Sequence, residues 1–177
     1  MVQYNLTITT QANNYEQLER GWYLVLINVA QSPVHLGLMF KGLLYEYTVK
    51  QGFKRTKYAT WSKQYTKLKL PIIALGLDEL GYSWEDIETQ LDDAFNTFNK
   101  APLSCIMPIN TVLQELYNIN TTNCTTIFSL LDKLKFSNII TQTLLLNSST
   151  PAQNDGVFGI EMYDFNVVEN YISGLKK

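Results

Sequence analysis

His35 is the only histidine in the chain, and the carboxylate of Glu46 follows it across a short turn. The residues between them are mostly apolar, and Lys41-Gly42 supplies the turn of a predicted hairpin. Counted from this turn, His35 and Glu46 are cross-strand or diagonal neighbours on one face of the two strands. An imidazole beside a carboxylate can act as a general base with a group that orients it.

Cys124 is the candidate nucleophile. Asn123-Cys124 opens a segment in which apolar residues recur at helical spacing up to about Phe136, so we expect Cys124 in the first turn of an amphipathic helix. Free backbone N–H groups and the helix dipole at that position favour the thiolate. In this interpretation Cys124 attacks a carbonyl carbon, His35 takes and returns the proton, and Glu46 holds the imidazole tautomer.

The oxyanion formed by such an attack needs hydrogen-bond donors. The backbone N–H at the start of the predicted helix, at Asn123-Cys124, is one candidate, and the hydroxyl of Tyr23 or Tyr47 is another. The alternative for Cys124 is a small buried hydrophobe, as most free cysteines are. Cys105, the other cysteine, lies between Pro102 and Pro108 and is expected to have that packing role.

The order of these groups resembles that of a known superfamily. His35-Leu-Gly-Leu, Tyr45-Glu46 and Asn123-Cys124-Thr-Thr are similar to the motifs of circularly permuted papain-like proteins of the NlpC superfamily, which include YiiX-like proteins and the lecithin retinol acyltransferase group. The resemblance covers about residues 22–136. It implies a histidine on a sheet, a cysteine on a packed helix, and acyl transfer or hydrolysis through a thioester. The acyltransferase members carry a second histidine where Glu46 stands, so their substrate is not carried over.

Hydrophobic periodicity predicts an α+β domain in which an antiparallel sheet packs against helices, with the histidine strand before the cysteine helix. We expect one domain over 1–177, with 137–177 as an extension outside the resemblance. The expected strands are 4–10, 22–29, the two arms of the hairpin, 65–75 and 157–165. The expected helices are 83–99, 109–117, 124–136 and 167–175, with a helical turn at 14–20. Residues 53–64 are expected to form a loop or an irregular basic strand, and 139–146 fits either strand or helix.

Composition limits the kind of protein. Hydrophobic residues make up 46% and charged residues 17% of the chain, which is typical of a globular domain. No secretory signal or membrane-length apolar run is present, so a cytoplasmic protein with free thiols is expected. One histidine and two distant cysteines form no metal-binding pattern, and neither Gly37 nor Gly42 belongs to a nucleotide fingerprint, so no metal or other cofactor is expected.

Charge is segregated along the sequence. Half of the 14 basic residues lie between Lys50 and Lys69, and the segment from Asp78 to Asp93 holds many of the 16 acidic ones. Trp61 and two tyrosines interleave with the basic run, a combination that can bind nucleic acid. The favoured alternative is a solvated face that complements the acidic helix after it.

Two classes of function therefore follow from the sequence. The first is a thiol hydrolase, a peptidase or amidase, that acts on a peptide, amide or acyl substrate. The second is a non-enzymatic subunit of a larger assembly such as a virus particle, in which an inactive papain-like domain binds a protein partner. Low charge, many Tyr, Asn and Thr residues, and a polar C-terminal segment favour the second class.

Overall fold

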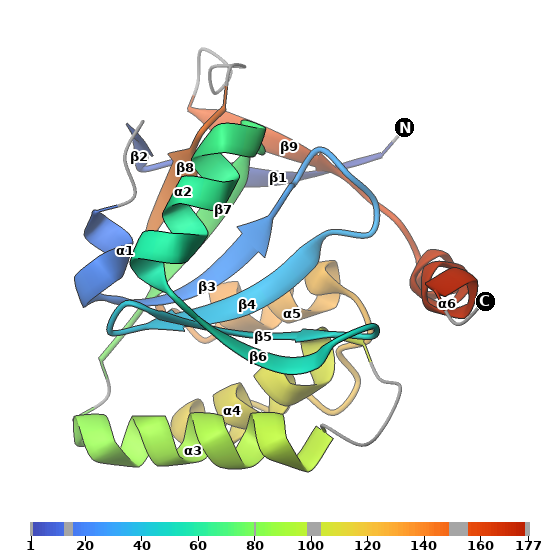
Figure 1. Ribbon diagram of the computed structural model, residues 1–177. Helices are drawn as coiled ribbons and strands as arrows, with labels where there is room; N and C mark the ends of the chain where they lie inside the picture. The colour runs from blue at the N-terminus through green and yellow to red at the C-terminus, as the bar shows by residue number, and fades with distance from the viewer. Residues whose placement is uncertain (1, 13–15, 80, 99–103, 149–155, 176–177) are drawn as a thin grey trace.

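The computed structural model describes residues 2–12, 16–79, 81–98, 104–148 and 156–175. They form an α+β protein with six helices, a seven-stranded sheet and a two-stranded sheet (Figure 1). The strands of the large sheet follow the order β2-β8-β7-β3-β4-β5-β6. Their bounds are β2 Thr10–Ala12, β3 Trp22–Ile27, β4 His35–Phe40, β5 Leu43–Thr48, β6 Gly52–Lys57, β7 Ile72–Leu77 and β8 Ile140–Leu146.

Most neighbouring strands of this sheet run antiparallel, and only β2 pairs with β8 in parallel. The predicted hairpin is confirmed as β4 and β5, and its turn residues Lys41 and Gly42 both have positive φ. In the smaller sheet β1 (Gln3–Thr7) pairs antiparallel with β9 (Val157–Glu161). Residues 139–146, for which periodicity allowed either strand or helix, contain strand β8. This strand places residues beyond 136 inside the main sheet.

Helices cover both faces of the large sheet. Their bounds are α1 Gln17–Arg20, α2 Tyr58–Leu68, α3 Trp84–Thr97, α4 Ile106–Tyr117, α5 Ile127–Phe136 and α6 Phe165–Leu175. α1 and α2 contribute Leu18 and Trp61 to the smaller of two buried clusters, and α3, α4 and α5 contribute to the larger one on the opposite face. α6 contains no buried residue and lies at one margin of the molecule (Figure 1).

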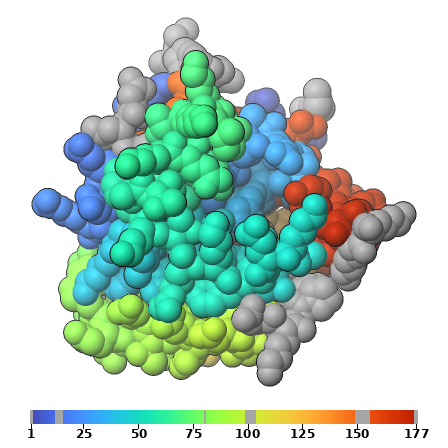
Figure 2. Space-filling model, viewed as in Figure 1, coloured from blue at the N-terminus to red at the C-terminus, as the bar shows by residue number. Residues whose placement is uncertain are grey.

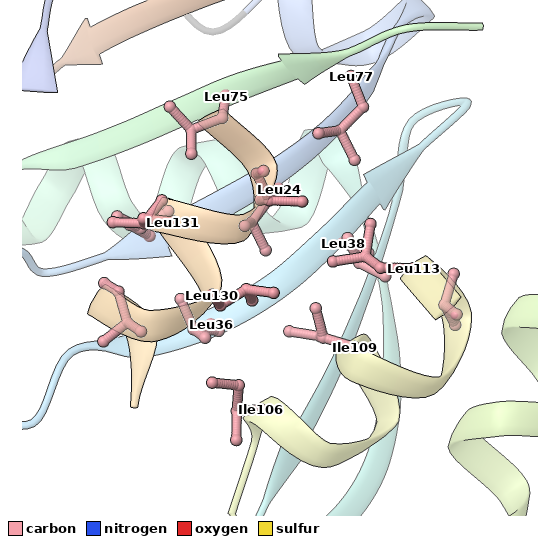
Figure 3. Packing of buried hydrophobic residues seen from close by; sticks show 14 of the residues in the cluster. Leu24, Leu36, Leu38, Leu75, Leu77, Ile106, Ile109, Leu113, Leu130 and Leu131 are labelled. Carbon is pink, nitrogen blue, oxygen red and sulfur yellow. The ribbon is translucent and has the colours of Figure 1, made fainter. Parts of the chain in front are cut away.

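Packing between α4 and the sheet positions the site. Alternate residues of β4, Leu36 and Leu38, belong to the larger cluster together with Ile106 and Ile109 of α4, as Figure 3 shows. Because side chains alternate along a strand, these two leucines lie on the same face of the sheet. The helical spacing of the two isoleucines places both of them against that face. As a result the N-terminus of α4 lies at the end of the sheet where β4 begins.

Several expected boundaries were wrong. The loop or irregular basic strand expected at 53–64 is a regular strand, β6, up to Lys57, and residues 58–68 form α2. The strand expected at 65–75 therefore begins only at Ile72. Tyr58, Trp61 and Tyr65 anchor α2 at helical spacing, but the lysines and polar residues between them obscured this period. α4 also begins earlier than expected, at Ile106, because Pro108 occupies the first helical turn, where a missing N–H removes no intrahelical hydrogen bond.

The expected position of Cys124, in the first turn of a helix, was also wrong. α5 begins at Ile127 with Thr126 as its N-cap, where Thr126 and Ser129 form a capping box. Cys124 therefore precedes the helix, in a turn closed by the hydrogen bond from its N–H to the carbonyl of Thr121.

Among the described residues, no helix is long and apolar enough to cross a membrane.

Candidate active site

His35 and Glu46 meet as the hairpin predicts. Gly37 is paired with Glu46 in the register of β4 and β5, which makes His35 and Glu46 diagonal neighbours. The His35 Nε2 lies 3.0 Å from the Glu46 Oε2. The Glu46 side chain is only 8% exposed and that of His35 29%, so this pair is largely protected from water.

The thiol beside this pair belongs to Cys105. Cys105 is the N-cap of α4 and is partly exposed, and its sulfur forms a hydrogen bond with His35. The expectation that Cys105 has only a packing role does not fit this position.

The electrostatics of the pair favour a thiolate and an imidazolium. Burial alone would raise the pKa of Cys105, but the hydrogen bond and charge of His35, with the N–H groups of Leu36 and of Cys105 itself, lower it overall. Burial opposes protonation of His35, yet its contacts with Cys105 and Glu46 raise its pKa above the usual value. The N-terminal end of α4, with no acidic residue in its first turn, adds to the stabilisation of a negative sulfur.

Cys124 has a different environment. It is buried, its carbonyl accepts a hydrogen bond of 2.9 Å from the Asn110 amide, and its thiol contacts Ser129. Burial raises the pKa of this thiol, although Ser129 and Lys133 partly oppose the increase. His35 does not contribute to the pKa of Cys124, and the pairing of Cys124 with His35 predicted from sequence is corrected to Cys105.

The proposed oxyanion donors are dispersed. Tyr23 points to the opposite face of the sheet, where its hydroxyl accepts a hydrogen bond of 3.0 Å from Gln142. Asn123 is exposed and lies outside the pocket that contains Cys105. Tyr47 does line that pocket. Tyr163, which sequence reasoning missed because its segment lies far from the motifs, lines it as well.

A pocket of about 460 Å³ opens onto Cys105 and His35. Its walls come from the β3–β4 connection, the turn after β5, the starts of α4 and α5, and α6, and most of their exposed surface is apolar. α6 contributes one face with helical spacing, formed by Val168, Tyr171, Ile172 and Leu175. In the space-filling view α6, in red, borders this end of the molecule (Figure 2).

Comparison of the chain with protein-family models, with curated proteins and with solved structures finds no match. The resemblance to the NlpC superfamily therefore remains an expectation based on the residues themselves. Among the described residues, no group of three or more His, Cys, Asp or Glu side chains is arranged to hold a metal ion.

The basic segment is divided between β6 and α2. Arg55 forms an ion pair with Asp92 of α3, at 3.2 Å, as the complementary-face interpretation expects. Trp61 is 1% exposed and packs against Tyr65, with ring centroids 5.2 Å apart. A buried tryptophan cannot stack on a base, so the aromatic part of the nucleic-acid hypothesis loses its main residue.

Proposed function

We propose that this protein is a thiol hydrolase of permuted papain-like organisation that cleaves an amide or ester through a thioester on Cys105. The observation that carries the proposal is the contact chain from a helix N-terminal thiol through His35 to a buried carboxylate, at the end of a pocket. Nucleophile, base and orienting group in one chain are the elements of covalent acyl transfer.

The reaction begins from the thiolate of Cys105 and the imidazolium of His35. The sulfur attacks the carbonyl carbon, a C–S bond forms, and the carbonyl π pair moves to oxygen. When this pair returns, the bond to the leaving nitrogen or oxygen breaks, and His35 donates its proton to the leaving group. Neutral His35 then takes a proton from water, the resulting hydroxide attacks the thioester carbonyl, and the C–S bond breaks. This step releases the acid and regenerates the Cys105 thiolate and the His35 imidazolium. Glu46 orients the imidazole and stabilises its charged form throughout.

The pocket favours an apolar acyl group. Its described lining includes no Asp or Glu, and Lys50 and His35 are the ionisable groups with positive charge. A volume of about 460 Å³ is within the ordinary range for small-ligand sites. A cationic acyl group would be buried without a counter-charge, which is costly, whereas an apolar group would cover the exposed face of α6.

The test is alkylation of Cys105 by iodoacetamide as a function of pH, followed site by site by mass spectrometry. We expect the Cys105 rate to rise with a midpoint below the ordinary thiol pKa of about 8.5, because its pKa is lowered, while Cys124 reacts only above that value. In His35→Ala the midpoint of Cys105 should move upward. Two slow thiols, both indifferent to His35, would instead favour the alternative, a non-enzymatic subunit.

A further inference from the structure

Tyr163 lies in the connection between β9 and α6, and two contacts fix its position. Its hydroxyl oxygen accepts a hydrogen bond of 3.0 Å from the backbone N–H of Val34. Its ring packs edge-on against Phe128 of α5, with centroids 4.9 Å apart and an interplanar angle of 67°. The phenol is thus held both at its ring and at its oxygen.

The hydroxyl of Tyr163 still has a hydrogen to donate. Its oxygen is the acceptor in the bond with Val34, and no acceptor for the hydroxyl hydrogen is found within the described part of the chain. Burial raises the pKa of Tyr163, the Val34 N–H partly opposes this, and the charge of a Cys105 thiolate raises it further. The group therefore stays protonated at neutral pH, as a hydrogen-bond donor must.

This donor lies near the reacting groups, since the charge of Cys105 acts on the Tyr163 hydroxyl. Tyr163, His35 and Cys105 line the same pocket, and Val34, which holds the phenol oxygen, directly precedes His35 in the chain. Tyr47 lines the pocket too, but from strand β5, next to the Glu46 that orients the imidazole. Tyr163 thus reaches the pocket from a different element than any of the triad residues.

We infer that the Tyr163 hydroxyl is an oxyanion donor: it hydrogen-bonds the carbonyl oxygen of the substrate while the sulfur of Cys105 attacks the carbon. No proton leaves the phenol. The C–S bond forms, the π pair collects on the oxygen, and the hydrogen bond shortens as that oxygen becomes negative. This inference rests on the proposed function, since it names a further catalytic residue of the same reaction.

The experiment compares two reactions of Tyr163→Phe, a change that keeps the ring packed on Phe128. With p-nitrophenyl acetate as the probe, acylation passes through an oxyanion, and we expect kcat to fall by about 10²-fold with little change in KM. Alkylation by iodoacetamide develops no oxyanion, so the Cys105 rate and its pH midpoint should stay unchanged. Tyr4→Phe, a matched change that removes a phenol hydroxyl outside the pocket from a ring that also packs on Phe128, should retain most of the acylation rate.

Three results would overturn the inference. Loss of both reactions would mean that Tyr163 only orders the Cys105–His35 pair, and loss of neither would mean that it touches no oxyanion. A wild-type Cys105 with an ordinary pKa would refute the proposed function itself, and the role of Tyr163 with it.

If Tyr163→Phe unfolds because Val34 loses its acceptor, Tyr163→His, which keeps a ring and a donor, should retain more acylation than Tyr163→Leu.

Discussion

Cys105 and Cys124 both lie near the start of a helix, and both contribute to the same hydrophobic cluster. The pKa of the Cys105 thiol is nevertheless lowered, whereas the pKa of the Cys124 thiol is raised. Cys105 is the N-cap of α4 and contacts His35, whereas Cys124 lies ahead of α5 and contacts Ser129. The comparison shows that proximity to a helix start is insufficient to activate a thiol. A positively charged partner at hydrogen-bond distance decides the sign of the shift.

Substitution of each cysteine by alanine should give the largest difference in effect between the two positions. In Cys105→Ala we expect the acylation of the protein by p-nitrophenyl acetate to fall by about 10³-fold or more, because the nucleophile is gone. Cys124→Ala should keep the rate within about twofold and lower the free energy of unfolding by about 1 kcal/mol, since it removes a buried side chain. The burst of p-nitrophenolate and a thermal melt measure the two effects. The reverse outcome would restore Cys124 as the nucleophile.

Glu46→Gln should weaken the activation of Cys105 without removing the nucleophile. The amide retains the shape of the carboxylate but removes a charge that helps to raise the pKa of His35, so the imidazolium that stabilises the thiolate is lost at lower pH. We expect alkylation of Cys105 at pH 6 to slow by about tenfold and its midpoint to move upward.

The control for this change is Asp92→Asn, which removes an acidic group that is paired with Arg55 and is 35% exposed. Surface pairs of this kind contribute little, so neither the rate nor the midpoint should change. An equal effect of both variants would indicate that overall charge, and not the contact with His35, controls the thiol.

The smallest effect on the reaction is expected from a substitution in α6. Ile172→Ser removes apolar area from the wall of the pocket, while no residue of this helix is buried, so the melting temperature should change little. The wild type should prefer p-nitrophenyl hexanoate over the acetate by up to about fourfold per buried methylene, and Ile172→Ser should reduce that preference. Glu169→Gln, a change outside the pocket lining on the same helix, serves as the control. An unchanged preference would place the acyl group elsewhere.

Local sequence patterns predicted much of the fold. The hairpin of β4 and β5, the buried strand β3 and the capped helix α3 follow from alternation, apolar continuity and the Ser83–Asp86 capping box, which are all short-range signals. α2 was missed although Tyr58, Trp61 and Tyr65 recur at helical spacing, because the basic and polar residues between them masked this short aromatic period. The start of α4 was placed three residues too late, at Ile109, although a proline such as Pro108 is tolerated in the first helical turn.

By itself the sequence determined that His35 and Glu46 would meet, because both belong to one hairpin whose register is set by its turn. It could not determine which thiol joins them. That choice depends on how α4 docks on β4, through contacts such as those among Leu36, Leu38, Ile106 and Ile109, and on the turn that places Cys124 ahead of α5. Tyr163 likewise reaches the pocket only because β9 pairs with β1 and directs the chain back across the end of β4. Contacts between residues so distant in sequence are decided by packing, on which local periodicity carries no information.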